Sequence, residues 1–208
     1  MPRLKGLYAI TDERLTPNDS ICAQVKECLL GGASIIQLRN KTAPDSELFD
    51  IALELKRLCR EYGAFFIIND RVRLAREVGA DGVHIGKDDT DYKKAREILG
   101  QKAIIGVSCY NEIERALEAF KLGADYVAFG SFFPSPTKPE AVKAPMDLLK
   151  KAKKELDIPI CVIGGITASN VKKLIVYGAD MAAVITDLWT APDIKAKAQE
   201  FCKCFNAP

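Results

Sequence analysis

Basic side chains lie directly after apolar segments of this chain, at intervals that would let them share one ligand. Arg39 and Lys41 alternate along the sequence, so in an extended segment their side chains point to the same face. Lys138 lies in a second loop, residues 130–139 (GSFFPSPTKP), which holds three prolines. Taken singly, Arg39 and Lys41 would be solvated surface charges. Taken with Lys138, they predict a site for a polyanion, because a guanidinium binds phosphate in a bidentate way.

Two carboxylates follow two further apolar segments. Asp70 comes after residues 65–68, and Asp89 comes shortly after His84 and Ile85. If these segments are neighbouring strands, about 4.8 Å apart, the two carboxylates converge. Mg²⁺ is usually held by one or two carboxylates together with substrate phosphate oxygens, so the pair predicts a magnesium site. Helix capping is the competing interpretation, and it is the better one for Asp88.

A repeated pattern indicates the elements that must position these residues. Glycine, alanine and then serine or aspartate open four apolar runs, in residues 32–36, 79–83, 123–127 and 178–182. Each repeat follows an amphipathic segment. Glycine just past a helix allows the left-handed residue that ends it, and Asp or Ser supplies a polar turn before a strand. The repeats therefore predict four helix-to-strand junctions.

The remaining apolar runs bring the number of predicted strands to eight. They are residues 7–10, 65–68, 104–107 and 160–163, and the intervening segments carry helical spacing, as in Leu48, Ile51, Leu55 and Leu58. Continuous apolar strands joined by helices indicate a parallel sheet covered on its outer face. Eight such units predict an α/β protein, a compact single-domain TIM (β/α)₈ barrel over residues 1–208. A doubly wound open sheet is the alternative, but it would not normally need eight units of near-equal spacing.

The predicted barrel suggests a second anion site. Barrel enzymes carry their active site at the carboxyl ends of the strands, often with a phosphate site after strands 7 and 8. At this point in the strand order the chain has a glycine turn, residues 163–167 (IGGIT), followed by a helix start. Its backbone amides around Gly165, with those near Ile185 and Thr186, can bind a phosphate. Two anion sites at one end of a barrel suit two phosphorylated substrates.

Other reactive side chains are better explained by packing. His84 alternates with Val83 and Ile85, so it faces the barrel interior, where a hydrogen-bonded structural imidazole is expected. A hydrolytic pair of His84 with Cys109 lacks a third residue to orient it. Trp189 is expected to pack. The seven cysteines show no paired C-x-x-C spacing, so we expect mostly small buried thiols and neither zinc nor disulfides.

Composition excludes several classes of function. The chain has 208 residues, of which 48% are hydrophobic, and a formal net charge of +2 without a basic stripe. These values argue against nucleic-acid and membrane partners. Neither a signal peptide nor an apolar run of about 20 residues is present, so we expect a cytoplasmic protein. A homo-oligomer is compatible with this composition.

Six motifs, in order, resemble the thiamine-phosphate synthase family over nearly the whole chain. They are QLRNK at 37–41, IND at 68–70, HIGKDD at 84–89, GVS at 106–108, FGS through TKP at 129–139, and IGGIT at 163–167. The resemblance implies an enzyme that joins hydroxymethylpyrimidine diphosphate to hydroxyethylthiazole phosphate, releasing pyrophosphate and giving thiamine phosphate. It also implies Mg²⁺ and a dissociative mechanism through a pyrimidine cation, without a protein nucleophile.

The resemblance implies a role for each residue of the two sites. Ser108, Arg39 and Lys138 would be catalytic, and Asp70 and Asp89 would hold Mg²⁺. The diphosphate would bind Gln37, Arg39, Lys41, Asn69 and Lys138, with Ser108 nearby. Ser135 and Thr137 would line the thiazole side, and Gly165, Ile185 and Thr186 would bind the thiazole phosphate. The prolines of residues 130–139 would limit the entropy lost when this loop closes over both substrates.

Two other functions are open at this stage. Aminothiazole tautomerases resemble this chain but carry a histidine near the position of Tyr110, two residues after Ser108. A regulatory barrel could keep the phosphate site and lose the chemistry, although Asp70, Asp89 and Lys138 argue against that loss. Asn40 stands where the synthase family often has an acid, a change that we expect to be tolerated.

Overall fold

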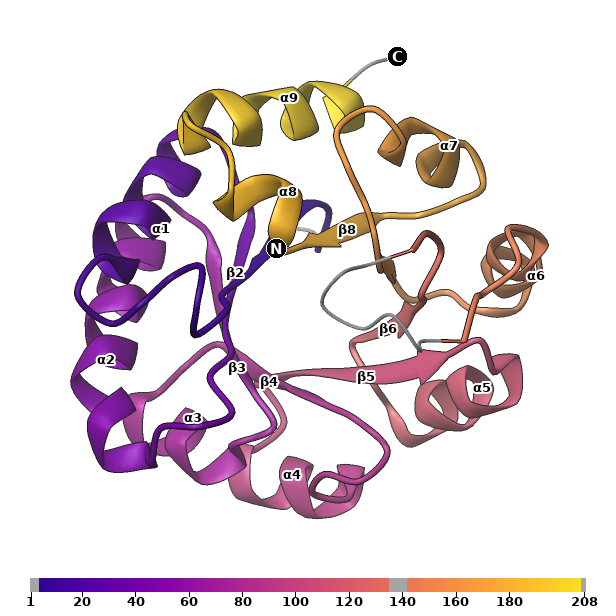
Figure 1. Ribbon diagram of the computed structural model, residues 1–208. Coiled ribbons are helices and arrows are strands. Elements are labelled where there is room, and N and C mark those ends of the chain that lie inside the picture. Colours follow the sequence, from indigo (N-terminus) through magenta and orange to yellow (C-terminus); the bar gives the residue numbers. More distant parts are fainter. Residues whose placement is uncertain (1–3, 135–141, 207–208) are drawn as a thin grey trace.

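A computed structural model describes residues 4–134 and 142–206, and the strands within these ranges form a closed parallel barrel in sequence order (Figure 1). The predicted residues Ser135, Thr137 and Lys138 lie outside the described ranges. The closed order β1 to β8 confirms the barrel and excludes the open doubly wound sheet. The strands are β1 (Gly6–Ile10), β2 (Ile35–Leu38), β3 (Phe65–Asn69), β4 (Gly82–Ile85), β5 (Ile104–Tyr110), β6 (Tyr126–Phe129), β7 (Ile160–Ile163) and β8 (Met181–Val184).

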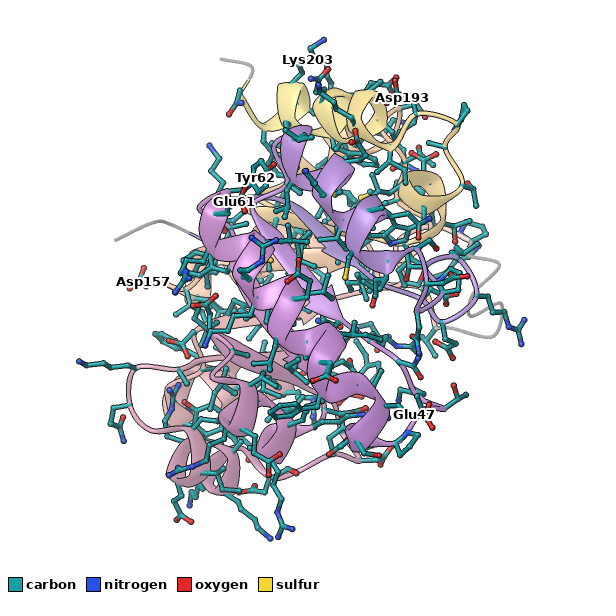
Figure 2. The ribbon with its side chains drawn as sticks, turned by 90° about the vertical axis from the view of Figure 1, so that its left-hand side faces the viewer. Glu47, Glu61, Tyr62, Asp157, Asp193 and Lys203 are labelled. Atoms are coloured by element: carbon teal, nitrogen blue, oxygen red, sulfur yellow. The ribbon has the colours of Figure 1, made fainter. Side chains whose placement is uncertain are left out.

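Helices surround the barrel as an outer ring (Figure 1). They are α1 (Ile21–Leu30), α2 (Asp45–Glu61), α3 (Val72–Val78), α4 (Tyr92–Leu99), α5 (Ile113–Leu122), α6 (Asp147–Glu155), α7 (Val171–Val176), the short α8 (Thr186–Trp189) and α9 (Ile194–Asn206). Figure 2 shows that α2 runs along the barrel wall, with Glu47 near one end of the molecule and Glu61 toward the other. Because α2 follows β2, Glu47 marks the side of the barrel where the strands have their carboxyl ends.

The repeated glycines end helices as predicted. Gly79 and Gly123 adopt φ of 63° and 94° at the ends of α3 and α5, in the left-handed region that favours glycine. The aspartates of the repeats do more than form a turn, since each carboxylate accepts a hydrogen bond from a backbone N–H of the preceding strand. The pairs are Asp81 with Phe66 at 2.7 Å, Asp125 with Ile105 at 2.8 Å, and Asp180 with Ile160 at 3.0 Å. The repeat thus ties each strand to the one before it.

One aspartate differs from its sequence-based interpretation. We expected Asp88 to cap a helix, but the N-cap of α4 is Asp91, whose carboxylate accepts from the N–H groups of Lys93 and Lys94. The helix begins later because a turn occupies residues 86–90, in which Asp89 accepts from the N–H of Gly86 at 2.6 Å. Asp88 is therefore a surface residue of this turn.

The apolar interior has two parts, as expected for a barrel inside a ring of helices. The larger cluster lies between the strands and the helices. The smaller one fills the barrel, where Tyr8, Ile35, Ile67, Tyr126 and Met181 are almost completely buried. Cys161 belongs to this inner cluster, and Cys28, Cys59 and Cys109 are also buried, as predicted. All seven cysteines are free.

Gly106 makes room for a large residue of the inner cluster. A Cβ atom at this position would lie 1.9 Å from Cζ of Tyr126, and the φ of Gly106 is not in the left-handed region. We expect Gly106→Ala to lower the free energy of unfolding by about 3 kcal/mol, since overpacking a close-packed core displaces its side chains. Urea denaturation measures this loss. Gly100→Ala is the control, because it adds a Cβ with no atom within 4 Å and costs only the strain of φ +84°.

None of the helices in the described ranges is both long and apolar enough to cross a membrane.

Candidate active site

Arg39 lies one residue beyond β2, and the end of β1 holds its backbone. The buried Thr11 side chain accepts from the Arg39 N–H at 2.9 Å and donates to the Arg39 carbonyl at 3.2 Å. Nη1 of Arg39 lies 3.7 Å from Oε2 of Glu13, a buried oxygen without a hydrogen-bond partner among the described residues. The Arg39 side chain is only 18% exposed. Thr11 therefore fixes the backbone of Arg39, and the guanidinium lies largely buried beside Glu13.

Lys41 is held more loosely, in the loop between β2 and α2. Its side chain is 53% exposed, and Nζ lies 3.7 Å from Oδ2 of Asp70. The loop itself is fixed by Arg71, to which the sequence assigned no role. Nη2 of Arg71 donates to the carbonyls of Asn40 and Ala43 at 2.8 Å each, and its guanidinium pairs with Asp45. Arg71 thus positions the segment that carries Lys41.

Asp70 follows β3 directly and pairs with Lys41 of the neighbouring loop. Its backbone has φ 52°, a conformation that is uncommon for a residue with a side chain and often marks a functional site. Oδ2 accepts from Nδ2 of Asn69 at 2.7 Å. Burial raises the pKa of Asp70, the charge of Asp89 raises it further, and Lys41, Arg71 and Arg39 lower it. The charge of Asp89 therefore acts on Asp70, and the convergence of the two carboxylates on one metal ion stays a prediction.

These two carboxylates are the pair that the sequence predicted as ligands of a cation. The hydrogen bonds that the structure describes for Asp70 and Asp89 use Oδ2 in both. No cluster of three or more carboxylate, histidine or cysteine ligands occurs within residues 4–134 and 142–206. Carboxylate oxygens are hard ligands of the kind that Mg²⁺ prefers, so the chemistry of the pair fits this ion.

Polar side chains form a continuous chain across the barrel below these charges. Nε2 of Gln37 donates to the Tyr8 hydroxyl at 2.6 Å, and the hydroxyls of Tyr8 and Tyr126 are 2.8 Å apart. Nδ1 of His84 lies 2.9 Å from the Tyr126 hydroxyl, and its Nε2 lies 2.8 Å from Oγ of Ser108. His84 is thus a hydrogen-bonded interior imidazole, as expected, and burial lowers its pKa to about 4.

A cavity of about 250 Å³ opens at the carboxyl ends of β7 and β8. Its lining includes Pro134, Gly164, Gly165, Thr167, Ile185 and Thr186. Gly165 has φ 60°, and a Cβ there would lie 2.2 Å from the carbonyl oxygen of Pro134, so only glycine allows the two loops to meet. The structure therefore brings together Gly165, Ile185 and Thr186, the three residues that the sequence predicted for the second anion site.

Several residues of this region were not found from the sequence. Tyr8, Tyr126, Glu13 and Arg71 received no role. A tyrosine within an apolar run, at a position that faces the interior, was the available signal for the first two. Trp189 packs as expected, with its indole N–H donating to the Ile10 carbonyl at 2.6 Å. Tyr110 lies at the end of β5 with φ 53° and is partly exposed.

The chain folds into a closed (β/α)₈ barrel, and cations, carboxylates and glycine loops lie at the carboxyl ends of its strands. This combination is typical of one class of proteins, the barrel enzymes that act on phosphorylated small molecules. Comparison with known proteins narrows the class. The family model described as thiamine monophosphate synthase matches residues 7–188. The chain therefore belongs to the thiamine monophosphate synthase family and is an enzyme of thiamine phosphate synthesis.

Individual relatives match along nearly their whole length. The thiamine-phosphate synthase of Methylococcus capsulatus is 47% identical, over 98% of this chain and 91% of that protein. The thiamine-phosphate synthase of Nitrosococcus oceani is 48% identical, over 97% and 93%. The solved structure of thiamine phosphate pyrophosphorylase from Pyrococcus furiosus superposes with a TM-score of 0.88 at 40% identity, covering 97% of this chain and 95% of that one. These relatives support the synthase over the tautomerase and the regulatory barrel.

Proposed function

We propose that this enzyme binds hydroxymethylpyrimidine diphosphate at β2 to β5 and hydroxyethylthiazole phosphate at β7 and β8, and joins them into thiamine phosphate and pyrophosphate. The observation that carries this assignment is the presence of two different anion-binding environments at one end of the barrel. One combines Arg39, Lys41 and Asp70, and the other is the glycine-lined cavity around Gly165. Their chemistry suits a diphosphate with a metal ion and a monophosphate held by backbone amides.

Arg39, Lys41 and the loop residue Lys138 bind and stabilise the departing diphosphate. Three side chains with hydrogen-bonding groups, on β2, β3 and β5, orient the pyrimidine diphosphate; they are Gln37, Asn69 and Ser108. Ser135 and Thr137, in the loop of Lys138, line the thiazole side. The Gly165 turn and the start of α8 at Ile185 and Thr186 bind the thiazole phosphate.

Asp70 and Asp89 would hold Mg²⁺, which when bound would supply positive charge to stabilise the departing diphosphate. A cation there also relieves the repulsion between the two carboxylates, which contributes to the raised pKa of Asp70. Two further statements about this protein, its cytoplasmic location and its assembly into a homo-oligomer, are still predictions made from the sequence alone.

The reaction needs no protein nucleophile. The bond between the pyrimidine methylene carbon and the diphosphate oxygen breaks with its electron pair going to pyrophosphate, and the amino group of the ring donates electrons to the resulting cation. The thiazole nitrogen then forms a bond to the methylene carbon, which gives thiamine phosphate. The protein supplies alignment of the two substrates and stabilisation of the leaving group.

An assay of the purified protein tests this proposal. With both substrates and Mg²⁺, we expect thiamine phosphate and pyrophosphate in equal amounts. Omitting the thiazole phosphate should abolish thiamine phosphate formation. Pyrophosphate release at the full rate without the thiazole substrate would contradict the proposal, as would rapid aromatisation of the thiazole carboxylate tautomer.

The second anion site has a test of its own. Gly165→Ala should raise KM for the thiazole phosphate at least about 10-fold, because the added Cβ displaces the loop and forfeits a hydrogen bond to a charged group, worth about 1.5–3 kcal/mol. KM for the pyrimidine diphosphate should change much less. Gly63→Ala is a matched control, since Gly63 has a similar φ of +69° but no atom within 4 Å of an added Cβ. Equal effects on both KM values would place the thiazole phosphate elsewhere.

A further inference from the structure

The polar chain inside the barrel links two residues that the proposed function places on substrate, Gln37 and Ser108. The residues between them are Tyr8, Tyr126 and His84, which come from β1, β6 and β4. Tyr8 and Tyr126 are 1% and 0% exposed, so water does not compete for their hydroxyls. All four links are 2.6–2.9 Å long, within the range of good hydrogen bonds. We call these five residues the interior relay.

The interior relay has a direction that follows from counting protons. Nε2 of Gln37 carries only donor hydrogens, so Tyr8 accepts there and must give its own proton to Tyr126. Tyr126 in turn gives its proton to Nδ1 of His84. The neutral imidazole then carries its proton on Nε2 and donates it to Oγ of Ser108. The hydroxyl proton of Ser108 is left to point away from the relay.

Each member is kept in the protonation state that this count requires. Burial raises the pKa of Tyr8 and of Tyr126, so both phenols keep their proton. The backbone is shaped to fit the relay as well, because Gly106 of β5 leaves the space in which the Tyr126 ring lies. The rings of His84 and Tyr126 are also stacked, with centroids 5.6 Å apart and an interplanar angle of 22°.

We propose that Tyr8 and Tyr126 are positioning residues that fix His84 as its Nε2–H tautomer and thereby present the Ser108 hydroxyl as a hydrogen-bond donor to the substrate. This inference rests on the proposed function for one point, that Ser108 contacts substrate. The proposed tautomer has a specific chemical consequence. A Ser108 hydroxyl that donates favours a hydrogen-bond acceptor atom of the substrate at this position and disfavours a donor atom. With the opposite direction of the relay, Ser108 would give its proton to His84 and present only lone pairs.

The tautomer is measured directly, because His84 is the only histidine of the chain. Long-range ¹H–¹⁵N spectra of histidine-labelled protein without substrate, at neutral pH, should show Nε2 protonated and Nδ1 unprotonated. Tyr126→Phe removes the donor to Nδ1, so the preference for this tautomer should be lost. Tyr8→Phe should weaken it. A wild-type spectrum with the proton on Nδ1 would overturn the proposal, and so would an unchanged tautomer in Tyr126→Phe.

Kinetics test whether the relay acts through Ser108. We expect Tyr126→Phe to lower kcat about 10-fold, the loss of roughly one net hydrogen bond. In a Ser108→Ala background, Tyr126→Phe should lower kcat by less than about twofold, because the effects of mutations within one hydrogen-bond network are not additive. Tyr92→Phe is a matched control, since its hydroxyl donates to the Gly123 carbonyl on the outer side of the barrel. Full additivity of Tyr126→Phe and Ser108→Ala would show that Tyr126 does not act through Ser108.

The two proposals fail separately. If the wild type makes no thiamine phosphate but His84 carries its proton on Nε2, the substrate assignment is wrong and the relay direction stands. If the enzyme is active and the tautomer is Nδ1–H, the substrate assignment stands and the relay direction is wrong. Should Tyr126→Phe fail to fold, the wild-type spectrum and Tyr8→Phe still decide the question.

Discussion

Arg39→Ala is expected to lower kcat/KM by about 10²- to 10³-fold, the loss seen when one preorganised donor to developing negative charge is removed. Arg39 has the features of such a donor. Its backbone is bonded to Thr11 at the end of β1, its side chain is largely buried, and its guanidinium lies at the carboxyl ends of the strands. Because pyrophosphate gains charge as it leaves, the interaction is stronger in the transition state than in the bound substrate. Steady-state kinetics with both substrates measure the effect.

Stability measurements separate this effect from damage to the fold. The free energy of unfolding should also fall, by about 1–3 kcal/mol, since the change removes the cation that lies 3.7 Å from the buried Oε2 of Glu13. Arg57→Ala serves as the control, because Arg57 is an exposed residue of α2 paired with Glu54 and Glu61 on the same helix. Wild-type kinetics in a folded Arg39→Ala variant would show that Arg39 does not bind the leaving group. The same test applies to Lys138→Ala.

Asp89→Asn and Asp70→Asn are each expected to lower kcat by about 100-fold at low Mg²⁺, because a metal ion that neutralises a leaving group contributes several kcal/mol. Excess Mg²⁺ should restore part of the rate. The pH profile should keep its shape, since neither carboxylate transfers a proton in this mechanism. A general acid and base would instead lose a limb of the profile while metal affinity stayed unchanged.

Rates measured against Mg²⁺ concentration at several pH values distinguish the two roles. Asp157→Asn is a suitable control, because Asp157 is exposed and Figure 2 places it at the opposite end of the molecule from Glu47. Activity of chelator-treated wild-type enzyme would refute the metal assignment. A mutant that binds Mg²⁺ normally but loses a pH limb would refute it equally.

The sequence by itself determined the barrel and the end of it at which the candidate site residues gather. Both follow from local patterns, which do not depend on distant contacts. Glycine after a helix, as at Gly79 and Gly123, reflects a backbone conformation that glycine adopts without strain. Continuous apolar strands reflect burial on both faces of a parallel sheet. Given eight such units, polar residues directly after a strand must gather at one end, as Arg39 and Asp70 do.

Only the tertiary structure decided which side chains meet. Tyr8 and Tyr126 are 118 positions apart in the chain, and their hydroxyls touch because the registers of all eight strands bring both to the same level of the barrel. A periodic pattern predicts that a residue faces inward, but not which residue it faces. The same holds for Arg71, to which the sequence assigned no role and which holds the loop of Lys41. Pairings of this kind depend on strand register and loop path, which are set by packing of the whole barrel and not by any local stretch of sequence.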